Sequence, residues 1–179
     1  MSKLSVLKAA VFSAVVLVGC GLGGCAKPTL KVANVTFTAD PSLKDPNGKL
    51  PLVEVAVIGA SANDAREWNE YKVDSFFSGN DPRRAAAMPY TKNLVFTNDS
   101  PGPKTIAAND EIWKVWRDRG ATRLFIFANS KNLSAGTGGL ELRRKELPFT
   151  TDRWKTNQID ISITSGGVVV NSKMEPIDP

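Results

Sequence analysis

The feature that most constrains the fold of this chain is a series of short segments in which apolar and polar residues alternate. The clearest, residues 157–164, places Ile159, Ile161 and Ile163 on one face, as expected for a half-buried β-strand. A Gly-Gly pair then separates it from an apolar segment at 168–172, a spacing typical of a β-hairpin. Comparable segments lie at 31–39, 52–60, 93–98, 122–129 and 140–149. These six or seven strands predict a mainly β fold, an antiparallel two-sheet β-sandwich with the general layout of immunoglobulin-like domains.

Two segments have helical rather than alternating spacing. Within 63–79, aromatic residues such as Trp68 and Phe76 recur at helical intervals. Residues 110–119 carry acids in the first turn, basic residues in the last and a glycine directly afterwards, with Trp113 on the apolar face. We therefore expect one or two short helices whose aromatic side chains belong to the core.

The N-terminus has the layout of a secretory signal peptide. Lys3 and Lys8 form a positive start, and an apolar run follows at 9–18. A bilayer-spanning helix needs roughly 17 or more apolar residues, so this run is too short for an ordinary transmembrane segment. We predict that residues 1–19 are removed on export.

Two cysteines follow the apolar run, and both lie within short motifs that resemble the bacterial lipobox. Cys20 ends the motif LVGC and directly abuts the run, which favours it as the lipidated residue. Cys25 ends the motif LGGC and remains the alternative. A disulfide between the two is a third reading, because exported proteins meet an oxidising environment. We expect lipidation of Cys20, and several acyl chains such as palmitate would anchor the protein stably to a membrane.

The residue after the lipidated cysteine bears on its destination. It is Gly21 for Cys20 and Ala26 for Cys25, and neither is the aspartate associated with inner-membrane retention. We therefore expect the periplasmic face of the outer membrane.

Composition fits one domain behind this anchor. Residues 20–30 are rich in glycine and predict a flexible tether, 31–173 form the domain, and 174–179 form a tail. The chain is 42% hydrophobic and contains four tryptophans, which suffices for a core. Its formal charge of +5 includes two signal-peptide lysines, and the remaining basic residues are scattered, which argues against nucleic acid as a partner. The densest cluster, at 143–145, is expected to be a solvated edge.

Residue types needed for common chemistry are missing. The chain has no histidine, which removes histidine-based triads and histidine-ligated metals. The domain has no cysteine after Cys25, which removes thiolate metal sites and disulfides within it. No pair of carboxylates stands out for acid-base work. We expect no catalytic residues, no metal, no cofactor and no enzymatic activity.

Several of these segments together resemble the outer-membrane lipoprotein of the type VI secretion system, the TssJ family. The stretch FTADPSLKDPNGKLP at 37–51, followed by LVEVAVIGA, resembles the family's first strand, Asp/Pro/Gly-rich loop and apolar second strand. The motif DSFF at 74–77 resembles its short aromatic segment. RLFIFAN, RWKTNQIDISIT and GGVVVNS resemble its later strands, so that the likeness covers about 32–172.

The resemblance implies a transthyretin-like β-sandwich that binds the periplasmic part of the large inner-membrane subunit TssM and so helps to build the trans-envelope complex. In the family the loop between the first two strands takes part in that contact, which corresponds to 40–51 here. The candidate contact residues carried over are Leu43 as an exposed apolar residue and four polar ones, Asp40, Lys44, Asp45 and Asn47. The alternative for this loop is a long solvated connection, although long ordered loops are often functional.

A second function remains open on the residues alone. An unrelated lipoprotein β-sandwich could bind a small ligand or an envelope polymer, with Trp68, Trp113 or Trp154 as the binding surface.

Overall fold

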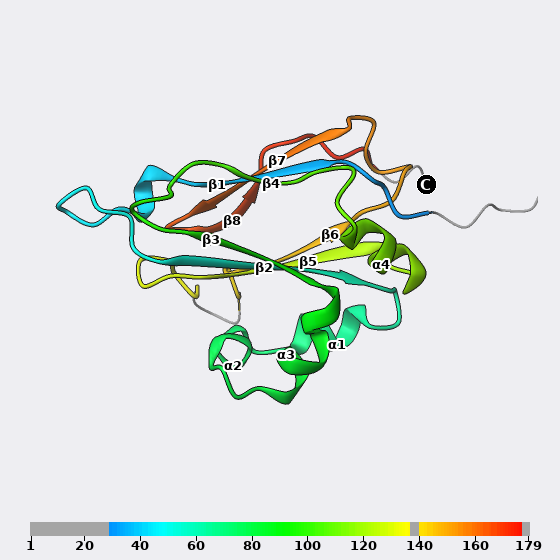
Figure 1. The fold of residues 1–179 in the computed structure, drawn as a ribbon, viewed down its shortest axis with the longest axis horizontal. Coiled ribbons are helices and arrows are strands. Elements are labelled where there is room, and N and C mark those ends of the chain that lie inside the picture. The colour runs from blue at the N-terminus through cyan, green and yellow to red at the C-terminus, as the bar shows by residue number, and fades with distance from the viewer. Residues whose placement is uncertain (1–28, 137–139, 177–179) are drawn as a thin grey trace, which may run out of the picture.

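The structure is a computed structural model that describes residues 29–136 and 140–176, and it contains two four-stranded β-sheets packed face to face (Figure 1). The first sheet has the order β4-β1-β7-β8, with β1 (Asn34–Ala39), β4 (Lys104–Ile106), β7 (Gln158–Thr164) and β8 (Gly167–Val170). The second has the order β3-β2-β5-β6, with β2 (Val53–Ala60), β3 (Thr91–Phe96), β5 (Arg123–Asn129) and β6 (Arg144–Pro148). The predicted mainly β two-sheet sandwich is confirmed.

One strand pair departs from the antiparallel expectation. β1 runs parallel to β7, with Val35 beside Ile159 and Phe37 beside Ile161. The other strand pairs of the described residues are antiparallel, including the predicted β7–β8 hairpin. Parallel neighbours need a long crossover connection, and more than a hundred residues separate these two strands in the sequence. Alternation predicts which residues share a face but not the direction of a distant partner strand.

The main core lies between the inner faces of the two sheets. Phe37 of β1 and Val55 of β2 are buried there. Ile159, Ile161 and Ile163 are also buried in this cluster, so their predicted inward face is confirmed. Burying each such side chain stabilises the fold by about 1.5–3 kcal/mol.

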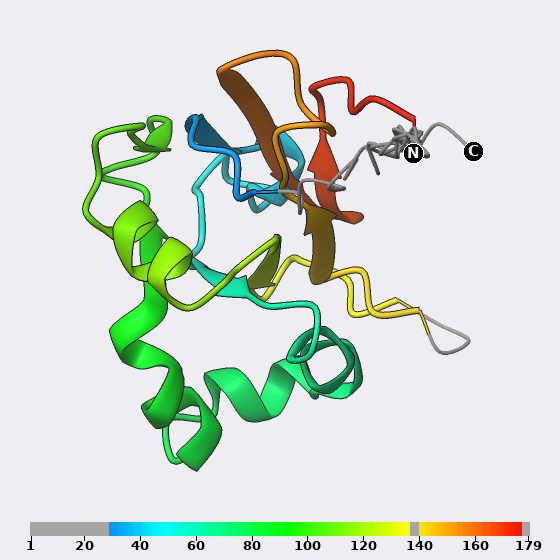
Figure 2. The same ribbon diagram turned by 90° about the vertical axis from the view of Figure 1, so that its right-hand side faces the viewer.

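A helical layer covers the outer face of the second sheet. It consists of α1 (Ala65–Glu70), α2 (Val73–Phe77) and α3 (Pro82–Ala87), which lie below that sheet in Figure 2. Phe76 of α2 stacks on Phe127 of β5, with ring centroids 5.1 Å apart. Because β5 is buried on both faces, its sequence is a continuous apolar run rather than an alternating one.

A fourth helix, α4 (Ile112–Asp118), packs at one end of the sandwich. Its Trp113 and Trp116 are fully buried, as predicted. Trp116 donates its indole N–H to the carbonyl of Tyr90 at 2.8 Å. Its ring lies so close to Gly59 that a Cβ at that position would be 2.3 Å from the Trp116 side chain. The glycine in β2 therefore makes room for α4.

The described residues contain more helix than the one or two short helices expected. Besides α1–α4 there are two short 3-10 helices, η1 (Pro41–Leu43) and η2 (Met88–Tyr90). The segment predicted as one helix, 63–79, divides into two at Tyr71, whose backbone is extended at φ −73° and ψ 136°. α3 begins at a proline behind Asp81, whose side chain accepts a hydrogen bond from a backbone N–H of the first turn at 2.8 Å.

The predicted signal peptide and both cysteines lie outside the described residues. Of the predicted tether only Thr29 and Leu30 are described, and Leu30 is buried and forms an isolated β-bridge with Thr150. The predicted tail is described as far as residue 176. In the parts of the chain that are described, no helix is long and apolar enough to cross a bilayer.

Candidate functional site

The β1–β2 loop, residues 40–51, projects from the end of the sandwich opposite α4 (Figure 1). Hydrogen bonds tie its base to three other segments of that end. Asn132 donates its side-chain N–H to the Leu43 carbonyl at 2.8 Å, and the Ser165 N–H donates to the Ser42 hydroxyl at 3.1 Å. The Leu50 N–H donates to the Asn98 side chain at 3.4 Å. The loop is therefore a fixed part of this end of the domain rather than a loose connection.

The base of the loop corrects one sequence-based expectation. Asp40 caps η1, because its Oδ1 accepts a hydrogen bond from the Ser42 N–H at 2.8 Å. This backbone hydrogen bond, joined by one from the Ser42 hydroxyl, lowers the pKa of the Asp40 carboxyl. The short helix turns Leu43 back into the main core, where its side chain is 0% exposed. Leu43 was expected to be an exposed apolar contact, and that expectation is wrong.

The outer part of the loop is held by a turn around Asp45. Its Oδ1 accepts hydrogen bonds from the Asn47 N–H and the Lys49 N–H, both at 2.9 Å. Its own N–H donates to the Lys49 carbonyl at 2.9 Å, and Gly48 takes the positive φ of 76° that the turn requires. The tip therefore keeps its shape by local hydrogen bonds alone.

The structure divides the predicted polar contact residues into two groups. Asp40 and Asp45 direct carboxylate oxygens to backbone N–H groups of the loop itself, so they shape it. Lys44 and Asn47 are exposed, and so is Lys49, which the sequence analysis did not single out. The charged and amide side chains that the loop exposes are thus two ammonium groups and one amide.

Two exposed apolar side chains near the loop were also missed. Leu52 directly follows it and is 54% exposed, and Val95 of β3 is 46% exposed. Val95 pairs with Glu54 of β2, so it lies on the outer face of the second sheet. Leu52 precedes Glu54 by two residues and is therefore on the same side of the chain. Leu52 could have been suspected from the sequence, because it stands out of phase with the inward residues Val53 and Val55.

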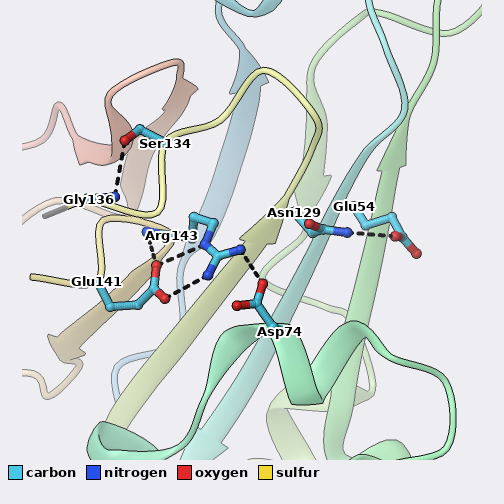
Figure 3. A network of polar contacts seen from close by, with 7 residues as sticks. All are labelled: Glu54, Asp74, Asn129, Ser134, Gly136, Glu141 and Arg143. Carbon is cyan, nitrogen blue, oxygen red and sulfur yellow. Dashed lines mark hydrogen bonds and ion pairs between the residues drawn. The ribbon is translucent and has the colours of Figure 1, made fainter. Parts of the chain in front are cut away.

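A buried arginine fastens α2 to the segment that precedes β6 (Figure 3). Arg143 forms a bidentate pair with Glu141, with Nε and Nη2 each 2.9 Å from a carboxylate oxygen, and its Nη1 lies 2.6 Å from Asp74 of α2. The hydrogen bonds that the guanidinium donates to Glu141 and then to Asp74 raise its pKa. Arg143 was expected at a solvated edge, but it is buried and structural. In the same view Asn129 of β5 donates to Glu54 at 3.4 Å.

The tryptophans do not offer a binding surface. Trp68, Trp113 and Trp154 are each 2% exposed or less, which overturns the idea that they bind a ligand or polymer. The indole N–H groups of Trp113 and Trp154 donate to backbone carbonyls at 2.8 Å. In addition, the residues that the structure describes hold no group of three side chains suited to a metal ion.

Comparison with solved structures finds components of type VI secretion systems. A chain of a structure described as a type VI membrane complex matches 80% of this chain and 100% of its own, with a TM-score of 0.56 and 13% identity. The T6SS lipoprotein TssJ1 from Pseudomonas aeruginosa matches 84% of this chain and 99% of its own, with a TM-score of 0.50 and 14% identity. This chain has the TssJ fold. A chain of a structure described as the T6SS protein TssM C-terminal domain from EAEC matches 77% of this chain and 98% of its own, with a TM-score of 0.51 and 12% identity.

The TssJ fold confirms, at the level of the fold, the resemblance predicted from the sequence. No protein-family model and no curated protein sequence matches the chain. At 12–14% identity the likeness concerns the backbone and the order of its elements. The alignment covers 98–100% of each matched chain, so the shared fold extends over the whole of these neighbours.

Proposed function

We propose that this protein is a non-enzymatic lipoprotein of a type VI secretion system. Its mature N-terminus is Cys20, lipidated and held at the periplasmic face of the outer membrane, with Cys25 as the alternative site. Its β1–β2 loop binds the periplasmic domain of a TssM-like inner-membrane subunit. The TssJ fold supports the family, and the solved structures that share it are described as secretion-system components rather than enzymes.

The proposed partner binding rests on one observation. The ordered β1–β2 loop lies at the end of the domain remote from the point where the chain enters it. Thr29 enters the domain beside α4, whereas the β1–β2 loop lies at the opposite end of the sheets (Figure 1). A lipid tether attached at the first end leaves the second end free to face the periplasm. Because local hydrogen bonds already fix the tip, a partner would not have to order it, and association loses less conformational entropy.

The proposed contact consists of Lys44, Asn47 and Lys49 with Leu52 and Val95 beside them. Exposed cations at the rim guide association, and a neighbouring apolar pair supplies area that a partner can bury. Leu43 is not part of it, because its side chain lies in the core.

The test is binding of the mature protein to the periplasmic domain of a TssM-like protein from the same cell. The double variant Lys44→Ala/Asn47→Ala and the single variant Leu52→Ser are each expected to weaken the affinity about tenfold, the usual effect at a contact that matters. Lys145→Ala, an exposed lysine on β6, is the matched control. Unchanged affinity in both loop variants would refute the proposed contact.

The anchor is tested by metabolic labelling with a palmitate analogue. Cys20→Ser is expected to abolish the label, and Cys25→Ser to leave it intact. The reverse pattern would move the lipid to Cys25, and label in both variants would refute lipidation at these motifs.

A further inference from the structure

A hollow of about 720 Å³ opens beside α4, at the end of the domain where Thr29 enters. It is formed by the start of the described chain, the end of α4, the start of β5 and the segment that follows β6; Figure 2 looks onto this end of the molecule. Its volume lies within the roughly 300–1,000 Å³ of typical ligand sites. We propose that this hollow binds one anionic phospholipid of the membrane to which the protein is anchored.

The walls suit a hydrocarbon chain. Leu30, Ala121 and Pro148 line the hollow, and the first two are buried members of the main core. Ala62 lines it from the exposed turn before α1. An acyl chain placed against these residues would be transferred out of water. This transfer is the general driving force for the burial of apolar surface.

The charges of the hollow suit an anionic headgroup. Arg117, Arg123 and Arg153 line it, against Asp152 as the one acidic residue among its lining residues. Arg123 is paired with Glu146, whereas neither Arg117 nor Arg153 takes part in an ion pair within the described part of the chain. Two uncompensated guanidinium groups beside an apolar hollow match a phosphate ester that carries an acyl chain.

Two hydrogen-bond donors in these walls lack an acceptor. The Nε atoms of Arg123 and Arg153 are buried and have no hydrogen-bond partner among the described residues. A buried donor without an acceptor is costly, and most are satisfied in native structures. Because these two Nε atoms are closed off from solvent, the outer N–H groups of Arg117 and Arg153 are the donors that phosphate oxygens in the hollow would meet first.

The location of the hollow favours a membrane lipid over a soluble anion, and this step rests on the proposed lipid anchor. Thr29 lies nine residues after Cys20, which limits its distance from the lipidated cysteine to about 30 Å. The lining residues Thr29 and Leu30 are the described end of that tether. Each basic residue near an anionic leaflet raises the affinity for that leaflet by about fivefold.

The experiment uses the full lipidated protein in phosphatidylcholine vesicles that contain a small fraction of photoactivatable phosphatidylglycerol, with its reactive group in the acyl chain. Cross-links are mapped by mass spectrometry. We expect them on 117–123 and 148–153, at least about fivefold above those from the same reactive group on phosphatidylcholine. Arg117→Gln/Arg153→Gln should reduce the labelling to the phosphatidylcholine level, and Ala62→Trp, which narrows the opening, should reduce labelling by both lipids.

Arg66→Gln is the matched control, because this arginine lies on α1 and its side chain is 86% exposed. Its labelling should equal that of the unchanged protein. Equal labelling by the two lipids, or labelling confined to residues before 29, would overturn the lipid site. Flotation of the same samples separates the two proposals: protein that floats without labelled pocket segments refutes only the lipid site, whereas protein that does not float refutes the anchor.

Discussion

Gly59 of β2 lies where the packing of α4 on the sandwich leaves no room for a side chain. A side chain there would meet Trp116 of α4, which in turn is fixed by its hydrogen bond to the Tyr90 carbonyl. The sequence shows a glycine near the end of an apolar strand, a position that usually weakens a strand. The reason for this glycine is seen only in the folded structure, where a helix more than fifty residues later in the sequence packs on it.

Gly59→Ala is expected to destabilise the domain by about 1–3 kcal/mol, because overpacking forces a buried ring or the backbone to move. Thermal unfolding measures this as a lower Tm. Gly102→Ala is the matched control, since a Cβ at Gly102 has no neighbouring atom within 4 Å. A Tm in Gly59→Ala equal to that of the control would show that α4 does not pack on β2 as described.

Leu43 and Arg143 show why single residues in turns and charge clusters are hard to assign from sequence. Leu43 is surrounded by turn-forming residues, which suggests exposure, but one turn of 3-10 helix returns it to the core. Arg143 stands in a basic run, but Glu141 and Asp74 surround it with carboxylates. The core around Leu43 and the Asp74 carboxylate beside Arg143 come from segments that only the tertiary fold brings close, whereas Glu141 stands two residues from Arg143 and could have been noticed in the sequence.

At the scale of elements, alternation and apolar runs predicted the strands well. β2, β5 and β7 lie within one residue of the predicted segments, because their patterns follow directly from one or two buried faces. β4 was missed, because three paired residues beside two prolines resemble a loop. The parallel pairing of β1 with β7 was also not predicted, since alternation is the same in either direction.

The β1–β2 loop yields a prediction at this scale that needs no partner. Asp45→Ala removes the acceptor of the Asn47 and Lys49 N–H groups, so amide hydrogen exchange at these two residues should accelerate. The Tm should change little, because the turn is exposed and separate from the core. Asp99→Ala, at an exposed position in the neighbouring β3–β4 turn, is the control. Unchanged exchange would contradict the fixed tip on which the proposed contact depends.

For the whole molecule, the electrostatics of the fold set its response to pH. Hydrogen bonds from Ser42 lower the pKa of Asp40, and a hydrogen bond from Arg143 lowers that of Asp74. Burial raises the pKa of Glu141, but hydrogen bonds from Arg143 lower it more, so its net shift is also downward. A carboxyl with a lowered pKa stabilises the folded state above its ordinary value and loses that contribution as the pH falls through its folded value.

The free energy of unfolding should therefore decline as the pH falls below the ordinary values, 4.5 for glutamate and 3.8 for aspartate. Between about pH 5 and 8 it should stay nearly constant, because the chain has no histidine to titrate there. Urea unfolding at a series of pH values measures both parts. A maximum of stability below pH 3.8, or a steep change near neutrality, would contradict this assignment of charges.

The whole molecule also separates its two proposed interactions. The tether and the arginine-lined hollow share the end beside α4, and the β1–β2 loop lies at the other end of the sheets. This polarity lets one small domain contact the membrane and a second protein at once.

The most direct test of the partner-binding claim is site-specific photo-cross-linking in cells that assemble the secretion system. A photoreactive amino acid at Asn47 should cross-link to the TssM-like subunit, because this side chain lies at the exposed tip of the loop. The same amino acid at Lys145, exposed on β6, should not. Cross-linking to that subunit from Lys145 but not from Asn47 would contradict the account.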